Sequence, residues 1–585
     1  MHHDTQHHAT HYDALIIGGG HNGLVCAAYL ARAGRKVLVL EARHVLGGAA
    51  VTEEFHPGFR NSVAAYTVSL LHPQVIRDLR LAEHGLRIVH RPMSNFVPLD
   101  PAADNAAKNG SGSTSSGNDS LRALRVGPNP DDTVREVARF SRKDAEALPR
   151  YYAMLDLLAD ELRNWILKAP PDPSAGMGGI IDTLKAGLAL RKLPLEAQRD
   201  LIELFGRSAG EMLDDWFETD ALKAALGFDS IVGAYTSPYS PGSAYVQLHH
   251  CFGEVNGKKG AWGHAIGGMG AITQAMAREC ERLGVTIRLD AKVARVVTRD
   301  GRATGVALDH GEEINARTVV ANVGPKLLFN QLVAANDLPA EFRTRLQHFK
   351  TGSGVVRMNV ALTELPDLCG LGTQQQPHHG AGIILAPSLD YMHRAYEDAR
   401  STGMSRSPVV EILIPSTLDD SLAPKGQHVA SLFCQSFAPQ LPAGSNTGSA
   451  VGSAVGSVAG SVAGSVAESP IAISWDDARE NAANLIIDTV TRFAPNFKRS
   501  VIARQVLTPL DLERTFGLTD GDIFHGRLSL EQLFASRPML GYANYKTPIK
   551  GLYLCGSGAH PGGGVTGAPG HNAARAILRN ETFAP

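Results

Sequence analysis

Residues 12–41 of the sequence read YDALIIGGGHNGLVCAAYLARAGRKVLVLE, and this stretch decides the fold. A short apolar run opens it and predicts a buried parallel strand. The glycine-rich turn 18–23 follows, and an alanine-rich segment after the turn predicts a helix. A second apolar run then predicts another buried strand, which ends at Glu41. The stretch is therefore predicted to form a complete βαβ unit.

The turn has the pattern Gly18-x-Gly20-x-x-Gly23, which is typical of a dinucleotide-binding turn when a strand precedes it and a helix follows. Gly18 permits the tight turn, Gly20 lets the backbone approach a pyrophosphate, and Gly23 lets helix and strand pack closely. The helix N-terminus offers free N–H groups to the phosphates. Glu41 is placed to accept hydrogen bonds from a ribose 2′-hydroxyl, which disfavours a 2′-phosphorylated cofactor.

Two further glycine-rich segments favour FAD over a nicotinamide cofactor. Gly47-Gly48-Ala49 lies just beyond the acidic strand end, where it suits an extended cofactor that continues past the pyrophosphate. The turn 556–564, near the C-terminus, follows an apolar run and precedes another predicted helix. Two such elements at opposite ends of one chain predict a single FAD that contacts both, and no second nucleotide fingerprint is present for NAD(P)H.

Three pieces of the sequence resemble the phytoene desaturase-related FAD-dependent oxidoreductases. They are YDALIIGGGHNGLVCAAYLARAGRKVLVLEARHVLGGAA, GGMGAITQAMA and GLYLCGSGAHPGGGVTGAPGHNAARAI. The resemblance implies an α/β fold with a discontinuous, glutathione reductase-like Rossmann-type FAD-binding domain. It also implies an inserted substrate domain of the α+β type.

The same resemblance assigns the cofactor contacts. It places the pyrophosphate, the adenosine ribose, the ribityl chain and the isoalloxazine against Gly18, Gly20, Asn22, Gly23, Glu41, Ala42, Arg43, Gly47, Gly48, Ala49, Val293, Gly556, Ser557, Gly564, Val565 and Ala568. The sequence departs from the family pattern at one position. Many related flavoproteins have an acid after the glycine of the last strand, and here Ser557 supplies a neutral hydroxyl to the ribityl chain instead.

The resemblance also gives domain boundaries. We expect an FAD-binding domain from residues 12–100, 262–335 and 540–585, and a substrate domain from residues 120–261 and 336–539. A polar N-terminal tail, 1–11, precedes them. Two low-complexity insertions, 104–119 and 442–468, interrupt the chain, and the second contains a GSAV/GSVA repeat that predicts a surface segment.

Catalytic residues leave a weaker signal, because the flavin itself carries the hydride chemistry. His560 lies in the C-terminal glycine-rich turn, and we expect it to accept a proton or to hydrogen-bond the flavin. Candidate substrate contacts are Tyr235, Tyr239, His249, His250 and Tyr542, with Tyr245, Trp262 and Tyr545 as further aromatic candidates. Packing roles are the alternative for all of them.

Composition excludes several classes of protein. A formal net charge of −2 over 585 residues favours no nucleic-acid partner. The six cysteines form no CxxC pair, which argues against dithiol chemistry, and we expect no metal site despite the histidine-rich tail. No signal peptide and no apolar run of about 18 residues is visible, so a cytoplasmic protein without a transmembrane segment is expected.

Three functions fit these features. The first is a dehydrogenase or desaturase that takes hydride from an apolar, isoprenoid-like substrate and is reoxidised by oxygen or a quinone. The second is an amine oxidase-type flavoenzyme, and the third is an FAD-binding regulatory protein with weak or no catalysis. A quinone or carotenoid-like substrate would bring the protein into peripheral contact with a membrane. The sequence gives no oligomeric state.

Overall fold

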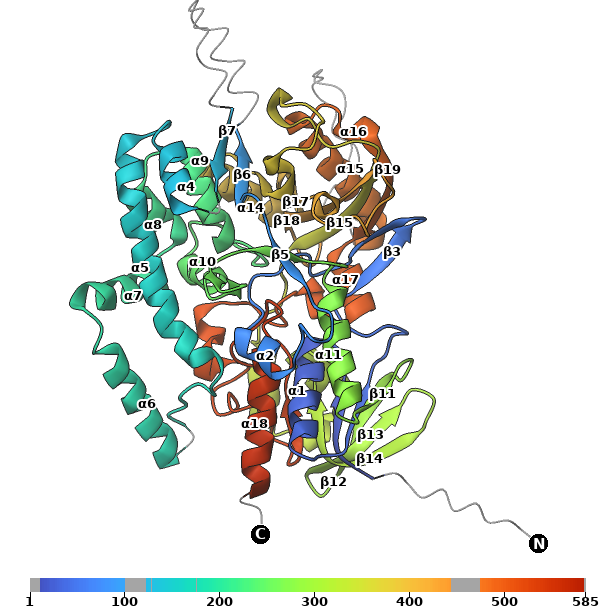
Figure 1. The fold of residues 1–585 in the computed structure, drawn as a ribbon. Coiled ribbons are helices and arrows are strands. Elements are labelled where there is room, and N and C mark those ends of the chain that lie inside the picture. Colours follow the sequence, from blue (N-terminus) through green and yellow to red (C-terminus); the bar gives the residue numbers. More distant parts are fainter. Residues whose placement is uncertain (1–10, 100–121, 128, 175, 443–473, 583–585) are drawn as a thin grey trace, which may run out of the picture.

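The computed structural model describes residues 11–99, 122–127, 129–174, 176–442 and 474–582 (Figure 1). Two seven-stranded sheets organise these residues, and segments from distant parts of the sequence build each of them. The tail 1–10 and the two predicted low-complexity insertions, apart from residue 442 itself, lie outside the described residues. The boundaries predicted for the two domains stay a prediction.

The first sheet contains the predicted βαβ unit. Strand β1 (Tyr12–Ile17) pairs in parallel with β2 (Val37–Leu40) on one side and with β14 (Glu313–Ala321) on the other. β11 (Thr286–Arg288) extends the parallel part beyond β2, and β20 (Leu552–Leu554) pairs in parallel with the end of β14. All four residues of β2 are buried, as expected of a strand covered on both faces.

The region after residue 262 departs from a simple βαβ repeat. Helix α11 (Gly270–Arg282) leads into a parallel strand, β11. The chain then forms an antiparallel hairpin of β12 (Val293–Arg299) and β13 (Arg302–Leu308), which joins β14. The turn between them holds Asp300 and Gly301 with positive φ, which suits a tight hairpin connection.

Helix α1 (His21–Arg32) contacts both α11 and α18 (Ala568–Thr582). A Cβ atom on Gly570 would lie 2.1 Å from the backbone oxygen of Asn22, so only glycine allows α18 to cross α1 this closely. The C-terminal glycine-rich turn is thereby held beside the N-terminal one. Because parallel strands present their carboxyl ends at one edge, the segments after β1, β2, β14 and β20 meet there.

The second sheet has the order β19-β15-β18-β17-β16-β6-β7 and lies beside the first (Figure 1). Its strands are β6 (Asn95–Pro98), β7 (Ala123–Val126), β15 (Val355–Leu362), β16 (Gly382–Leu385), β17 (Met404–Leu413), β18 (His428–Phe437) and β19 (Val501–Leu507). The central strands β15 and β18 are almost wholly buried. Helices α14 (Leu389–Thr402) and α15 (Trp475–Phe493) pack against this sheet.

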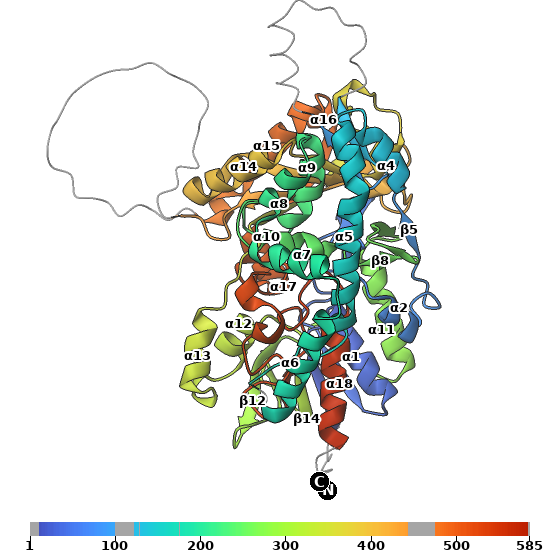
Figure 2. The same cartoon turned by 90° about the vertical axis from the view of Figure 1, so that its left-hand side faces the viewer.

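Residues 130–250 are mainly helical; for residues 131–227 the spacing of leucine and alanine predicts this. The helices are α4 (Pro130–Val137), α5 (Arg142–Ile166), α6 (Gly176–Leu190), α7 (Leu195–Gly206), α8 (Ala209–Trp216), α9 (Asp220–Gly227) and α10 (Ser243–His250). The 25-residue α5 runs along one side of the molecule, and α6 and α7 lie outside it (Figure 2). Among the described residues, no helix combines the length and apolar character needed to cross a bilayer.

Candidate functional site

A cleft of about 330 Å³ opens at the edge where the carboxyl ends of β1, β2, β14 and β20 meet. Residues from four distant segments line it. Among the predicted cofactor contacts, the lining includes Gly18, Gly20, Asn22, Glu41, Ala42, Arg43, Gly48, Ala49, Val293 and Ser557. The position agrees with the general rule that ligands of open α/β sheets bind at this edge.

The N-terminus of α1 is open to a ligand. Its N-cap, Gly20, supplies no capping side chain, and the first turn holds no acidic residue. The N–H groups and the positive end of the helix dipole therefore face the cleft without a capping side chain or an acidic residue in the first turn of the helix. Two polar atoms here, Nε2 of His21 and Oδ1 of Asn22, are buried without a hydrogen-bond partner in the described part of the chain. A bound dinucleotide fits these unpaired groups, because its diphosphate accepts hydrogen bonds from N–H groups and its hydroxyl groups can donate to the side-chain acceptors.

Glu41 is held in place by the turn that it faces. Its carboxylate accepts hydrogen bonds from the backbone N–H of Gly19, at 2.7 Å, and of Arg43, at 2.9 Å. Each oxygen retains a second acceptor site, because a carboxylate oxygen can accept two hydrogen bonds. A carboxylate fixed at the end of β2 and lining the cleft fits the recognition of ribose hydroxyls.

The two glycine-rich turns are joined by side chains. The Asn22 amide donates a hydrogen bond of 3.2 Å to Oγ of Ser557, across 535 positions of sequence. Asn322, at the end of β14, donates to the carbonyl of Gly18 at 3.1 Å and also lines the cleft. A Cβ atom on Gly20 would lie 2.9 Å from the Asn322 amide nitrogen. The cleft floor is therefore shaped by three strand ends together.

Several predicted cofactor residues support the cleft without lining it. A Cβ atom on Gly23 would lie 2.3 Å from the Gly18 carbonyl, and one on Gly556 would lie 3.3 Å from backbone atoms of residues 322–323. Gly47 has a φ of +130° and donates its N–H to the Gly19 carbonyl. Ala568 is fully buried at the start of α18. The structure gives these four a packing role beside the cleft.

A smaller inner chamber, of about 120 Å³, adjoins the cleft. The two cavities share four lining residues: His21, Ala49, His525 and Ser557. The predicted residues Gly564, Val565 and His250 line the inner chamber. The rest of its wall is Ala64, Ala65, Tyr66, Thr67, Ser69, Leu70, Val232, Trp262, Phe433, Ile523 and Phe524. Aliphatic and aromatic side chains dominate this wall.

His21 and His525 mark the junction of the two cavities. Burial, and then the proximity of His525, lower the pKa of His21 to about 3, while burial lowers the pKa of His525 to about 4. Nδ1 of His525, like Nε2 of His21, is buried and accepts or donates no hydrogen bond within the described ranges. Both imidazoles are therefore neutral at pH 7, and each has a ring nitrogen available to a ligand.

A buried polar network lies behind the inner chamber. Tyr66 donates its hydroxyl to Glu411 at 2.6 Å, and its ring stacks on Phe433 with centroids 5.0 Å apart. The guanidinium of Arg357 lies 4.5 Å from the centroid of the Tyr66 ring, and that of Arg91 lies 4.0 Å from Glu411. Burial raises the pKa values of both Tyr66 and Glu411. The network fixes the Tyr66 ring as one wall of the chamber.

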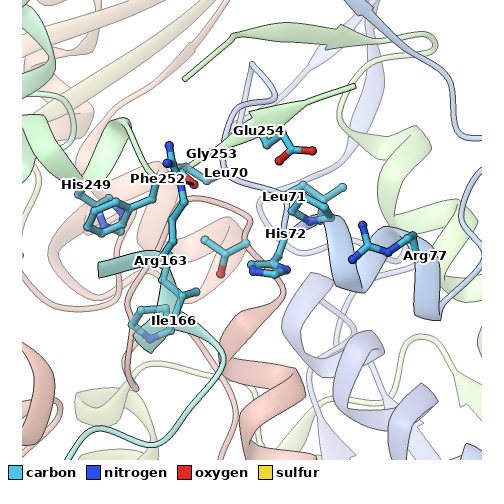
Figure 3. Close-up of a pocket in the computed structure, with 13 residues that line it drawn as sticks. Leu70, Leu71, His72, Arg77, Arg163, Ile166, His249, Phe252, Gly253 and Glu254 are labelled. Carbon is cyan, nitrogen blue, oxygen red and sulfur yellow. Dashed lines mark hydrogen bonds between the residues drawn. The ribbon is translucent and has the colours of Figure 1, made fainter. Parts of the chain in front are cut away.

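An outer chamber of about 250 Å³ lies on the other side of Leu70. Figure 3 shows Leu71, His72 and Arg77 on one side of it and Arg163, Ile166 and His249 on the other. Burial lowers the pKa of His72 to about 4 and that of His249 to about 3. Pro561 and Thr566 also line this chamber, so residues of the C-terminal glycine-rich turn, or next to it, line both chambers. The remaining lining residues are Pro73, Phe252, Gly253 and Glu254.

Other candidate side chains lie away from both the cleft and the inner chamber. Nε2 of His560 lies 3.2 Å from the carbonyl of Trp165, and burial lowers the His560 pKa to about 4. Tyr235 packs on Tyr396, Tyr239 donates to Asp214, and Tyr542 packs on Phe342. The side chains of His560, Tyr235, Tyr239 and Tyr542 therefore contact neighbouring protein groups and line neither the cleft nor the inner chamber.

Two of the six cysteines, although distant in the sequence, lie close together in the structure. Cys26 and Cys555 are fully buried, and they lie close enough to share a hydrogen bond. Burial first, and then this hydrogen bond, raise the pKa of the Cys555 thiol. Because the thiolate is the reactive form, this pair is unreactive. Among the described residues, no group of three potential ligands could hold a metal ion.

Sequence reasoning missed several residues of the site. Asn322 could have been found, because it directly follows the apolar end of the segment that forms β14 and lines the cleft. His21 is one of the unspecified positions of the glycine motif. Residues 513–518 and 523–525 carry no sequence motif that indicates a cofactor or substrate contact. They belong to the segment predicted for the substrate domain, and only the tertiary structure brings them to the cavities.

The buried histidines predict acid lability. An imidazole of the unfolded chain takes up a proton near pH 6.5, while His249 in the folded protein resists protonation down to about 3. The unfolded state therefore binds more protons between these values, and the free energy of unfolding falls as the pH falls. We expect His249→Gln to reduce this pH slope by up to about 1.4 kcal/mol per pH unit.

Denaturant unfolding between pH 4 and 7 measures this slope. His310→Gln is the matched control, because His310 is exposed and its ring lies beside the exposed carboxylates of Asp309 and Glu312. Equal slopes for His249→Gln and the wild type would contradict the assignment of a neutral, buried His249.

Comparison with known proteins identifies the cofactor. The sequence profile of the family described as "Flavin containing amine oxidoreductase" matches residues 23–360. Pyridine nucleotide-disulfide oxidoreductase domain-containing protein 2 of Rattus norvegicus is 41% identical over 97% of this chain and 94% of that protein. One component of the limonene dehydrogenase of Castellaniella defragrans is 26% identical over 97% of this chain and 94% of that protein.

A solved structure of putrescine oxidase bound to putrescine superimposes with a TM-score of 0.56 at 15% identity, covering 98% of this chain and 99% of that one. This likeness confirms the predicted fold class. The family match confirms FAD as the cofactor, in agreement with the open α1 N-terminus and the carboxylate of Glu41. When bound, FAD accepts hydride from a substrate. The chain therefore belongs to the flavin-containing amine oxidoreductase family and is an FAD-dependent oxidoreductase.

Proposed function

We propose that the protein is a dehydrogenase or desaturase that removes hydride from an apolar, isoprenoid-like substrate bound in the inner chamber. The observation that carries the proposal is the chamber wall. Its residues are mainly aliphatic and aromatic, and none of them is Asp, Glu, Lys or Arg. An apolar molecule gains free energy on leaving water for such a wall, whereas a charged group would lose its hydration there without a counter-ion.

The titratable groups of the chamber suit hydride removal from carbon. His250 stacks on Trp262 and its Nδ1 donates to the carbonyl of Val246, and burial lowers its pKa to about 4. With His21 and His525 it forms a neutral set at pH 7. We assign the acceptance of the accompanying proton to Nδ1 of His525, which has no hydrogen-bond partner among the residues that the structure describes.

The outer chamber supplies a route to the inner one. Leu70 lines both chambers and is buried between them, so movement of this single side chain would join the two. We propose that the substrate enters through the outer chamber. The name of the related limonene dehydrogenase, which refers to an apolar terpene, supports this class of substrate.

An amine is the second candidate substrate. The chamber wall contains four aromatic side chains, those of Tyr66, Trp262, Phe433 and Phe524. An ammonium or neutral amine can pack against such faces. The family description also refers to amines. An enzyme of this kind would release peroxide when oxygen reoxidises the flavin.

The reductive half-reaction tests the two candidates. The FAD-loaded protein is mixed anaerobically with limonene, with a carotenoid precursor or with putrescine, and loss of the visible flavin absorbance is followed. We expect reduction by the apolar compounds. Reduction by the amine alone would establish the second candidate, and no reduction by any member of a broader panel of both classes would favour an FAD-binding protein without catalysis.

Val232→Phe narrows the inner chamber and is expected to slow flavin reduction by the true substrate about tenfold or more. Val232 lines this chamber and is not one of the predicted FAD contacts, so FAD content should be unchanged. Val293→Phe is the reciprocal variant, because Val293 lines the cleft alone and its change should lower FAD content first. Unaltered reduction kinetics in Val232→Phe would place the substrate elsewhere.

We propose oxygen or a quinone as the electron acceptor, because the single dinucleotide turn is occupied by FAD. The protein is reduced anaerobically and then mixed with oxygenated buffer, with a soluble quinone or with NADP⁺, and the rates of flavin reoxidation by the three acceptors are compared. Rapid reduction of the oxidised flavin by NADPH would overturn this assignment.

A further inference from the structure

Helix α6 presents an apolar stripe to solvent. Its large apolar residues recur at helical spacing along one face, and none of its side chains is buried. The stripe and the neighbouring face of α7 expose between 44% and 73% of each side chain. We define this surface as the α6–α7 face: Met177, Ile180, Ile181, Leu184, Leu188, Leu195 and Ile202.

The exposed apolar residues of α6 lie on a different side of the helix from the residues that pack against the protein. The half-buried residues of α6, among them Gly179, Thr183 and Ala186, lie on the opposite side of the helix and face the protein. In α7 the same division holds, since Ala197 and Leu204 are buried while Leu195 and Ile202 are exposed. Figures 1 and 2 place both helices outside α5, on the side of the molecule that faces the viewer in Figure 2.

The glycine content of α6 points to an external partner. The helix contains Gly176, Gly178, Gly179 and Gly187, and glycine is a poor helix former in water. Three of these glycines have no heavy atom within 4 Å of an added Cβ, so close packing against the protein does not require them. A helix with this composition and no buried side chain gains most of its stability from a surface that covers its apolar face.

The charged residues beside the α6–α7 face indicate which kind of partner binds there. Arg199 lies on the same side of α7 as Leu195 and Ile202, and the exposed Arg191 and Lys192 directly follow the last residue of α6. Glu196 and Glu203 lie to the side of α7, about a quarter turn from Leu195 and Ile202. The apolar residues are therefore accompanied on their own face by cations.

We infer that the α6–α7 face docks on the surface of a lipid bilayer that contains anionic lipids. Apolar side chains from a helix lying in the interface, with flanking arginine and lysine near the headgroups, bind such a surface. A second copy of this chain is the alternative occupant, and the oligomeric state of the stripe variants distinguishes it from a bilayer. The docking rests on this face alone and stands whatever the substrate is.

Docking would also serve the proposed function. Ile166, the last residue of α5, lines the outer chamber, and the chain continues from it toward α6. A bilayer against α6 would thus lie near the chamber through which we propose that an apolar substrate enters. This clause alone rests on the proposed function.

Vesicle flotation of the full-length, FAD-loaded protein tests the docking. We expect binding to phosphatidylcholine vesicles that contain phosphatidylglycerol, and weaker binding to phosphatidylcholine alone. The variant Ile181→Asp with Leu184→Asp should lose binding at least about tenfold, because charged groups replace the centre of the stripe. Arg191→Glu with Arg199→Glu should remove the gain that phosphatidylglycerol provides.

Matched controls separate docking from unfolding. Ile502→Asp with Leu540→Asp changes two similarly exposed apolar residues outside the face and should leave binding unchanged. The milder pair Met177→Ser with Leu188→Ser repeats the test if the aspartates prevent folding, and FAD content reports folding in every variant. Wild-type protein that binds no vesicles, or stripe variants that bind as the wild type does, would overturn the inference. So would a wild-type dimer that the stripe variants convert to monomers, since a second copy would then cover the face.

Discussion

Gly20→Val is expected to abolish FAD binding while the chain still folds. Gly20 has φ near −72°, which valine adopts without strain, so the backbone of the turn tolerates the change. The new Cβ would lie 2.9 Å from the Asn322 amide, and its methyl groups would project into the cleft. The side chain would thus occupy the space into which a pyrophosphate must approach the N-terminus of α1.

The ratio of flavin to protein absorbance, measured after dialysis against excess FAD, gives the result. We expect the affinity for FAD to fall at least about a thousandfold, because loss of close phosphate contact removes several charge-assisted hydrogen bonds. Gly206→Val is the matched control, since nothing lies within 4 Å of an added Cβ there. Normal flavin content in Gly20→Val would place the phosphates elsewhere in the cleft.

Arg537→Met is expected to destabilise the protein by about 3–5 kcal/mol and to release FAD. Arg537 is fully buried, and its guanidinium donates to the carbonyls of Phe524, Gly526, Arg527, Gln532 and Ser557. It therefore fastens residues 524–527, which include His525, to the C-terminal glycine-rich turn. Methionine fills much of the same space but leaves these carbonyl groups without donors.

Urea unfolding with excess FAD, and again without it, separates the two expected effects, because a ligand that binds only the folded state adds to its stability. Arg406→Met is the control: Arg406 is exposed and pairs with Asp398 at the surface, so its loss should cost less than about 1 kcal/mol. Arg537→Lys keeps the positive charge but not the planar fork of donors, and we expect it to lie much closer to Arg537→Met than to the wild type. If the urea unfolding midpoint of Arg537→Met equals that of the wild type, then solvent or neighbouring groups donate hydrogen bonds to the carbonyl groups that Arg537 normally contacts.

Both predictions concern the same edge of the first sheet, and they differ in what the sequence reveals. The first follows from a local motif, and the second from a side chain in a segment of short 3₁₀ turns with no motif at all. Arg537 contributes through hydrogen bonds to backbone carbonyls, and any residue can provide a carbonyl. No residue type at its partners could have pointed to it.

The sequence by itself determined the βαβ unit, the α/β class and the cofactor. Strand β1, helix α1 and strand β2 depend on neighbours within about 30 positions, and the glycines of the turn are required by local backbone geometry and close approach. The predicted cofactor contacts that line the cleft, such as Gly20, Glu41 and Ser557, belong to such local motifs. Such local features can be predicted from a sequence because each residue type has its own conformational and hydrogen-bonding preferences.

Only the tertiary structure decided which side chains face the substrate chamber. Its wall combines residues near 65, 232, 250, 262, 433, 524 and 564, which come together because two sheets and a helical layer pack around one cavity. It also decided that His560 lies against a backbone carbonyl while His525 faces the chamber with an available nitrogen. Aromatic and histidine residues suit both a core and a site, so the burial and partners that separate these roles arise from contacts between distant segments and are absent from the local sequence.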